Sequence, residues 1–497
     1  MAFLNSTSDP LVESTFAGGS VTENSENHRL DLLEEYQPNF DFELKDYSRF
    51  IGPQGVEELL ELAKPLEGRG WVNVNSTFSG GGVAEMLRSA VPLARLLGVD
   101  AHWCTIRGSH EFFKVTKKFH DLLQGAGEPI ELEELFGAYL DTIDENANNT
   151  MIAADLVVVH DPQPAAMVMA APILGNVLWR CHIDTSMPDK TVWRFLLPYI
   201  NHCDGAIFTM PEFVGPGLRI PVYQVMPCID PLADKNHDYS DFEALEILNP
   251  LFNVHGVDPE RPIFAAISRY DMHKNQRRVL EAFQLLRDQK TWPVQPYLIF
   301  VGNTATDDPD GAAVLADLKE IAGDDPDVHF WVNVENNDQV VGALMHVARA
   351  FVHVSTREGF GLVVSEALWQ GTPVIGSRVG GIKQQVVDGE NGYLVDPLDT
   401  QAMASCMARF LEESDRATAM GRKGREFVQD NFLLPDLVRR YLVLMRYYAG
   451  ISSDLPHFRR NGLTHREVAH AFGRRHPHLP ELSLINEPRG PTGERRL

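Results

Sequence analysis

The sequence contains no apolar run of the roughly 18 to 20 residues that a membrane-spanning helix requires. Its first 20 residues, MAFLNSTSDPLVESTFAGGS, also have neither a basic segment nor a continuous apolar segment. A secretory signal peptide needs both of these segments. We therefore expect no signal peptide, no membrane partner and a cytoplasmic protein.

Cysteine is scarce as well. The five cysteines are odd in number, scattered along the chain and without the CxxC spacing typical of many metal and redox sites. Each lies in or near an apolar segment, so we expect buried free thiols in a reducing compartment. They are Cys104, Cys181, Cys203, Cys228 and Cys406.

Positive charge is in deficit, with 44 Lys and Arg against 69 Asp and Glu and a formal net charge of -25. This balance argues against nucleic acid and anionic membranes as partners. It does not forbid a local basic pocket for phosphate. We expect small-molecule substrates, and leave a homodimer open.

Two segments have metal-ligating residue types without a convincing arrangement. Residues 307–310, DDPD, contain a DxD triplet, but they precede a helical pattern and suit turn and N-cap acceptors better. Four histidines near the C-terminus lack cysteine or carboxylate partners at zinc-binding spacing. We therefore predict no metal site. The four are His465, His470, His476 and His478.

The chain of 497 residues is too long for one core and predicts two or three domains. Short apolar runs alternate with helical patterns in two successive series, which predicts two parallel sheets covered on both faces. We therefore predict an α/β fold with two Rossmann-like, doubly wound domains facing across a cleft. The expected strands are 71–76, 101–106, 156–161, 178–184 and 205–210, then 262–268, 297–302, 328–333, 351–355 and 372–377.

Composition sets the expected boundaries of these domains. Residues 1–35 are rich in Ser, Thr, Glu and Asn and predict a flexible tail. An acidic, proline-containing stretch predicts a connection between the domains, and a strong final helix could return to the N-terminal domain. The expected segments after the tail are 36–230, the connection 231–260, 261–433, the helix 434–450 and an extension over 451–497.

Three glycines follow the first predicted strand and open a helix, in NSTFSGGGVAEML. Without side chains, Gly81 and Gly82 allow a ligand to approach the backbone, and the N-terminus of a helix favours negative charge. The pattern is not GxGxxG, so it does not predict a dinucleotide site. A tight turn without any ligand is the alternative.

Two cations follow the first strand of the second series, in SRYDMHKNQ. Arg269 and Lys274 at the end of a strand suit a diphosphate, because Arg binds as a fork and Lys as a point charge. A surface salt-bridge cluster with Asp271 is the alternative for this segment.

Two glutamates flank a glycine turn in REGFGLVVSEAL. Glu358 is expected at the end of a strand and Glu366 in the helix that follows, with Gly359 and Gly361 allowing a tight turn between them. A carboxylate is a good acceptor for two vicinal sugar hydroxyls. The helix is apolar on nearly all sides, so we expect Glu366 to be buried with a partner.

Together these segments resemble the retaining glycosyltransferases of the GT-B fold, in the large family 4, whose motif is Glu, seven residues, Glu. The resemblance covers about residues 65 to 445. It implies that Glu366 holds the nucleotide ribose, that Glu358 contacts the transferred sugar, and that Arg269 and Lys274 bind the diphosphate. The implied donor contacts from the backbone are at Gly359, Phe360, Gly361 and Leu362.

The N-terminal half is similar to the trehalose-forming glycosyltransferring synthases and the related retaining trehalose phosphorylases. The similarity rests on VNSTFSGGGVAEMLRSAVPLARLLGVDAHW, EFFKVTKKFHDLLQG and WRCHIDTS. The synthases join nucleotide-activated glucose to free glucose, whereas the phosphorylases use glucose 1-phosphate. The chain length is nearer to the synthases, although both terminal extensions are longer than expected.

The resemblance also implies roles for residues around the sugars. His182 stands where the family places a histidine close to the donor sugar; a lone histidine is otherwise more often a core residue. Asp184 could accept from a glucose hydroxyl or cap the following turn, and Glu85 is the second acceptor candidate. The nucleobase is expected near residues 331–334, where we name Asn333.

The implied function is transfer of glucose from a nucleoside diphosphate glucose to glucose with retention, giving α,α-trehalose without metal or bound cofactor. The leaving phosphate would take the acceptor's proton in a front-face reaction. A trehalose phosphorylase, a nucleotide-sugar epimerase and a non-catalytic sugar-nucleotide sensor are the alternatives. Replacing Lys274 by Ala is expected to lower turnover severely with little loss of fold stability.

Overall fold

The computed structural model describes residues 33–37, 42–79, 81–148, 150–289, 291–303, 309–452, 459–460 and 463–464. Residues 1–32 of the predicted tail, Gly80, the first two residues of the DDPD segment and the four C-terminal histidines lie outside these ranges. Among the helices that are described, none combines the length and apolar character needed to cross a membrane. All five cysteines are buried free thiols, as expected.

The first domain is built on a seven-stranded sheet of order β1-β3-β2-β4-β5-β6-β7, parallel except for the antiparallel pair β1 and β3. Its strands are β1 (Glu34–Glu35), β2 (Gly70–Asn75), β3 (Asp100–Thr105), β4 (Ile152–His160), β5 (Ile173–Cys181), β6 (Gly205–Phe208) and β7 (Val222–Gln224). The helices are α1 (Ser48–Ala63), α2 (Gly81–Leu96), α3 (His110–Leu123), α4 (Leu132–Glu134), α5 (Leu140–Ala147), α6 (Met167–Ala170) and α7 (Lys190–Ile200).

The second domain has a six-stranded parallel sheet of order β10-β9-β8-β11-β12-β13. Its strands are β8 (Ile263–Ile267), β9 (Tyr297–Gly302), β10 (Val328–Val332), β11 (Ala350–His353), β12 (Val374–Ser377) and β13 (Gly392–Val395). The helices from here on are α8 (Asp241–His255), α9 (Gln276–Gln289), α10 (Pro309–Ala322), α11 (Asn337–Val347), α12 (Leu362–Trp369), α13 (Ile382–Gln385), α14 (Thr400–Glu412), α15 (Ser414–Asn431) and α16 (Leu434–Tyr448).

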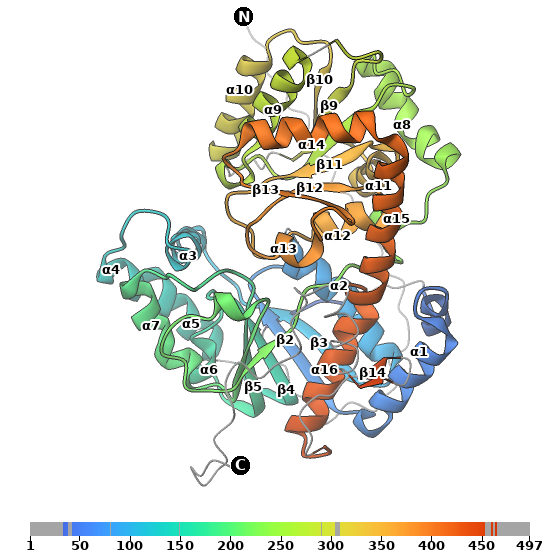
Figure 1. Cartoon of the computed structure of the whole chain (residues 1–497). Helices are drawn as coiled ribbons and strands as arrows, with labels where there is room; N and C mark the ends of the chain where they lie inside the picture. The colour runs from blue at the N-terminus through green and yellow to red at the C-terminus, as the bar shows by residue number, and fades with distance from the viewer. Residues whose placement is uncertain are drawn as a thin grey trace, which may run out of the picture.

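Short helical turns and a small ribbon complete the described chain. They are η1 (Leu44–Tyr47), η2 (Lys64–Leu66), η3 (Leu135–Tyr139), η4 (Pro211–Phe213), η5 (Asp234–Asn236) and η6 (Met272–Lys274), with the pair β14 (Arg459–Arg460) and β15 (Leu463–Thr464). Figure 1 shows the two domains stacked, with α15 and α16 running from the second domain down onto the first.

Both sheets are buried on both faces, which explains their continuous apolar strands. In β2, Trp71 faces the core under α1, α2 and α16, whereas Val72 and Val74 face the core under α3, α5 and α7. In β8, Ala265 and Phe264 alternate in the same way between the two cores of the second domain. The predicted α/β class with two Rossmann-like domains is confirmed.

The structure differs from the expected elements at the sheet edges. Glu34 and Glu35, assigned to the tail, pair with β3 as an edge strand. The short strands β7 and β13 were not predicted. These strands nevertheless complete the edges of the two sheets.

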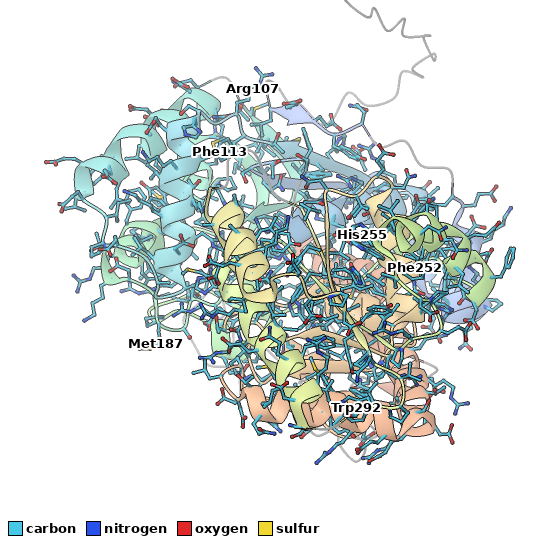
Figure 2. The ribbon with its side chains drawn as sticks, turned by 90° about the horizontal axis from the view of Figure 1, so that it is seen from above. Arg107, Phe113, Met187, Phe252, His255 and Trp292 are labelled. Carbon is cyan, nitrogen blue, oxygen red and sulfur yellow. The ribbon has the colours of Figure 1, made fainter. Side chains whose placement is uncertain are left out.

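The expected connection between the domains contains α8, which packs on the second domain. Ser240 caps its N-terminus in a capping box with Glu243, and Gly256 ends it in a left-handed conformation. Phe252 and His255, labelled in Figure 2, place their rings 6.0 and 5.8 Å from the ring of Trp331. The helix therefore covers one face of the second sheet.

The chain passes between the domains twice, and the two passages are hydrogen-bonded to each other. Ile229 N–H donates to Phe432 O at 2.9 Å, and Leu434 N–H donates to Ile229 O at 2.8 Å. After the second passage, α16 packs against α1, α2 and β4 of the first domain. The C-terminal helix thus forms part of the first domain's core.

A buried arginine ties α16 to the first sheet. Arg180 on β5 is 1% exposed and donates from Nη1 to the hydroxyl of Tyr441 on α16 and from Nη2 to Val225 O at 3.4 Å. A buried guanidinium needs these acceptors because its charge is removed from water.

Replacing Tyr441 by Phe removes an acceptor from Arg180 and should lower the free energy of unfolding by about 1–3 kcal/mol. Replacing Tyr447, half-buried on the same helix, by Phe is the matched control. Urea unfolding followed by circular dichroism measures both. Equal stability of the two variants would show that Arg180 does not depend on this contact.

Candidate functional site

The turn between β11 and α12 is held by hydrogen bonds from one side. Gly359 O accepts from the N–H of Gly381 at 3.2 Å. Gln385 Nε2 on α13 donates to Phe360 O at 2.6 Å and to Gly361 O at 3.3 Å. Since the N–H and C=O of a trans peptide point in opposite directions, the amide following each carbonyl points away from α13.

Two glycines in the loop between β12 and α13 make this turn possible. A Cβ atom on Gly381 would lie 2.5 Å from Phe360 Cα, and one on Gly380 would overlap the carbonyl oxygen of Glu358. Gly380 (φ +49°) and Gly361 (φ +79°) also have left-handed backbones, which favour glycine. Gly380 and Gly381 therefore shape the turn from beneath.

The first domain faces the other side of the turn. A Cβ atom on Gly359 would lie 2.5 Å from the carbonyl oxygen of His182, directly after β5. A Cβ atom on Gly82, in the first turn of α2, would lie 3.1 Å from Leu362 Cδ1. The turn and the carboxyl edge of the first sheet are thus in close approach, and the free amides of the turn lie between the domains.

Glu358 is a buried carboxylate with three donors. Its Oε2 lies 2.7 Å from Lys274 Nζ, 2.7 Å from His353 Nε2 and 3.1 Å from Ser355 Oγ. Burial alone would raise the pKa of Glu358, but Lys274 and His353 hold that pKa well below its usual range. Glu358 is therefore ionised, and it fixes the Lys274 ammonium beside the turn.

Lys274 is positioned by the loop after β8. Asp271 Oδ1 accepts from the N–H of His273 at 2.7 Å and caps η6. Asn275 has a left-handed backbone, and its Nδ2 donates to Val354 O at 3.0 Å and to Pro397 O at 2.7 Å. Asp271 thus orders the loop, and the ion pair of Lys274 is with Glu358 instead.

Arg269, the other predicted diphosphate ligand, is exposed at the end of β8. Its carbonyl accepts from Gln276 Nε2 at 2.8 Å, which fixes the backbone just before Lys274. The guanidinium is therefore accessible at the same sheet edge as the Lys274 ammonium.

Glu366 is buried in α12 with a cationic partner, as its apolar surroundings predicted. Its Oε1 lies 2.8 Å from Nζ of Lys235, and that ammonium also contacts Glu85 of α2. Burial raises the pKa of Glu366 and Glu85 adds to this rise, while Lys235 opposes it; the resulting pKa is about 7. The protonation of Glu366 therefore depends on both of these neighbours.

His182 belongs to a line of hydrogen bonds leading into the first sheet. His160 Nε2 lies 3.0 Å from Asn73 Oδ1, and His160 Nδ1 lies 3.0 Å from His182 Nε2. Burial, with Arg180 adding to it, lowers the pKa of both histidines well below the usual value. Because Asn73 Oδ1 only accepts, His160 Nε2–H donates to it, His160 Nδ1 accepts a hydrogen bond from His182 Nε2–H, and Nδ1 of His182 is an acceptor.

The remaining predicted residues have simpler surroundings. Asp184 Oδ1 accepts from the N–H of Ser186 at 2.9 Å, so it caps the turn in this structure. Asn333 is exposed beyond β10 with a left-handed backbone, and its N–H donates to Gly302 O at 3.2 Å. Gly81 also has a left-handed backbone, at φ +78°, where α2 begins.

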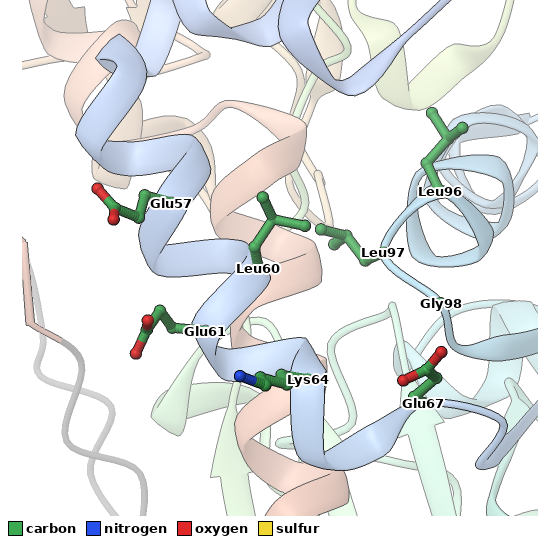
Figure 3. A pocket seen from close by; sticks show the side chains of 8 residues that line it. All are labelled: Glu57, Leu60, Glu61, Lys64, Glu67, Leu96, Leu97 and Gly98. Atoms are coloured by element: carbon green, nitrogen blue, oxygen red, sulfur yellow. The ribbon is translucent and has the colours of Figure 1, made fainter.

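A separate hollow of about 390 Å³ lies between α1 and the far end of α2 (Figure 3). Because α2 has 16 residues, its ends are about 24 Å apart, so this hollow is remote from Gly82 and the turn. Its lining is Glu57, Leu60, Glu61, Lys64, Glu67, Leu96, Leu97 and Gly98. None of the predicted site residues lines it.

Several residues of the site were missed from the sequence. Lys235 lies in a segment that was predicted only to be an acidic connection between the domains. Gln385 lies in a polar stretch after Gly380 and Gly381. His353 and His160 occupy strand ends in FVHVS and LVVVHD, a position shared with His182. A polar residue at the carboxyl end of a buried strand was the available indication.

The expectation that Lys274 can be removed with little loss of stability changes with this geometry. Lys274→Met leaves the Glu358 carboxylate, 12% exposed, without its ammonium, and should lower the free energy of unfolding by about 1–3 kcal/mol at neutral pH. The double variant Lys274→Met, Glu358→Gln should regain most of that loss. Thermal unfolding of wild type, Lys274→Met and the double variant is the measurement. If Lys274→Met were as stable as wild type, this account would be contradicted.

Two family models match this chain, one in each of its two domains. Residues 73–215 match the family model described as trehalose synthase, N-terminal domain, and residues 249–427 match glycosyl transferases group 1. A trehalose synthase of Pyrococcus horikoshii is 40% identical over 82% of this chain and 97% of its own. A trehalose phosphorylase of Grifola frondosa is 26% identical over 94% of this chain and 67% of its own.

The fold is also found in a solved structure, described as a UDP-forming α,α-trehalose-phosphate synthase from Burkholderia xenovorans. It has a TM-score of 0.61 and 15% identity, over 77% of this chain and 99% of that one. At this identity the likeness supports the two-domain GT-B architecture alone. The extensive similarity to the Pyrococcus protein shows more: the chain belongs to the trehalose synthase family of glycosyltransferases.

Proposed function

We propose that the protein transfers glucose from a nucleoside diphosphate glucose to free glucose, with retention, and forms α,α-trehalose. The observation that carries this proposal is the set of donors and acceptors around residues 358–366, which faces His182 of the first domain. Membership of the trehalose synthase family supports the choice of sugars.

In this proposal, the second domain holds the donor. Glu366 accepts from the ribose hydroxyls, and the amides of the turn at 359–362 lie along the diphosphate and the transferred glucose. Lys274 has three ammonium protons, of which Glu358 engages one. The others can bind the diphosphate together with the exposed guanidinium of Arg269.

Departure of the diphosphate creates an oxocarbenium-like sugar and new negative charge on phosphate. Preorganised donors aimed at that charge lower the barrier without reorganising during the reaction. Lys274, Arg269 and the turn amides supply such donors from this chain's own residues. In a front-face reaction, the leaving phosphate takes the proton of the acceptor hydroxyl, so no carboxylate nucleophile and no metal is required.

The acceptor glucose would lie on the first domain, near the carbonyl of His182 and its ring. Since His182 is held as a neutral acceptor, it adds no positive charge beside the developing cation. Gly359 packs against the carbonyl of His182, so the two domains are in contact beside the proposed sugar position, and exclusion of water there favours transfer over hydrolysis. Asp184 and Glu85 remain acceptor candidates, although each has a protein partner in the structure.

The direct test incubates the purified chain with UDP-, ADP- or GDP-glucose, with and without glucose, and identifies the product linkage by NMR. We expect α,α-trehalose and donor consumption that depends on glucose. The Lys274→Met variant is expected to lower turnover about 100-fold or more.

The same assay separates the alternatives. Donor turnover without glucose would favour an epimerase, and binding without turnover a sensor. Rapid formation of glucose 1-phosphate from trehalose and inorganic phosphate, with no use of any nucleotide donor, would overturn the proposal in favour of a phosphorylase, which the relatives of that name make a specific alternative.

A further inference from the structure

Lys235 joins both domains through two carboxylates. It lies on η5, and its ammonium contacts Glu85 on α2 of the first domain and Glu366 on α12 of the second. The side chains of Lys235 and Glu366 are 13% and 4% exposed, while that of Glu85 is 38% exposed. The ammonium is thus buried between an accessible carboxylate and a deeply buried one.

The backbone of Lys235 is fixed to the second domain. Gln370 Nε2 at the end of α12 donates to Lys235 O at 3.2 Å, and Trp369 Nε1 donates to Asn236 O at 2.8 Å. On α11, Gly342 approaches so closely that a Cβ atom there would overlap Lys235 O. Lys235 therefore moves with Glu366, and its contact with Glu85 is made across the domain boundary.

Among the described residues, Lys235 is the cation that compensates the buried charge of Glu366, and Glu85 is the competing anion. Three basic side chains on helices packed against α12 pair elsewhere. They are Arg425 of α15 with Asp238, Lys383 of α13 with Glu212, and His346 of α11 with Asp241.

We propose that Lys235 is a positioning residue for the nucleotide: it keeps Glu366 ionised as the acceptor of the ribose hydroxyls, and through Glu85 it couples ribose binding to contact between the domains. The proposal rests on the proposed function, since Glu366 is taken to hold the ribose. Lys235 itself contacts Glu366 and not the reacting atoms.

The physical reason is the balance of charge at Glu366. An ammonium beside a buried carboxylate favours its ionised form, and a second carboxylate nearby disfavours it. An ionised carboxylate is the best acceptor of hydrogen bonds from the two ribose hydroxyls, because a protonated carboxyl group has lost acceptor capacity. Removing Lys235 should therefore weaken nucleotide binding most at low pH, and removing the charge of Glu85 should have the opposite effect.

The test measures binding of UDP, ADP and GDP to the full chain by calorimetry from about pH 5.5 to 8.5, around the pKa of Glu366. Lys235→Met should lower nucleotide affinity about tenfold or more at pH 7 and move the pH midpoint of binding upward. Glu85→Gln should move that midpoint downward. The control is Lys383→Met, which is expected to match wild type. The side chain of Lys383 is 40% exposed, and its ammonium lies 3.9 Å from a carboxylate oxygen of Glu212 in the first domain.

A ligand without the ribose hydroxyls tests whether Lys235 acts through the contact between Glu366 and the ribose. With 2′,3′-dideoxy nucleoside diphosphates, the difference between wild type and Lys235→Met should largely disappear, whereas a merely structural role of Lys235 would weaken both ligands equally. Equal pH midpoints in wild type and both variants would overturn the role of Lys235. Failure of wild type to bind any of the three nucleotides would instead overturn the proposed function.

Discussion

The orientation of three peptide groups in the turn before α12 is the constraint on which the site depends. Their carbonyls accept from Gly381 and Gln385, so their amides are directed away from α13. Any side chain at Gly380 or Gly381 would push into the turn, and any at Gly359 would push the first domain away. A few glycines and one buried glutamine thus determine where a negatively charged donor could be received.

The charges around this turn are arranged in small groups that compensate one another. Glu358 is paired with Lys274 and His353, and Glu366 with Lys235. In the proposed function, this pairing fixes the lysine ammonium groups where a diphosphate would be received, in a chain with a net charge of -25. Each ammonium is fixed by a carboxylate that offsets its charge, and the exposed guanidinium of Arg269 adds positive charge at the same sheet edge.

Most of the fold was predictable because buried parallel strands and amphipathic helices leave a local pattern in the sequence. Glu358, Lys274 and Glu366 could be placed because they belong to compact motifs after such strands. The partner of Glu366 could not, since Lys235 lies 131 positions before it and meets it only through the packing of η5 against α11 and α12. The roles of Gln385 and Asn73 likewise arise from tertiary contacts, which no local pattern records.

The central claim is that one turn and two glutamates of the second domain hold a nucleoside diphosphate sugar against the first domain. A crystal structure of the full chain with intact nucleoside diphosphate glucose measures this most directly. The account predicts ribose hydroxyls within about 2.5–3.2 Å of the Glu366 carboxylate, diphosphate oxygens beside Lys274 and the amides of the turn, and glucose beside the contact between Gly359 and His182. A donor bound with its ribose away from Glu366, or its diphosphate away from the turn, would contradict it.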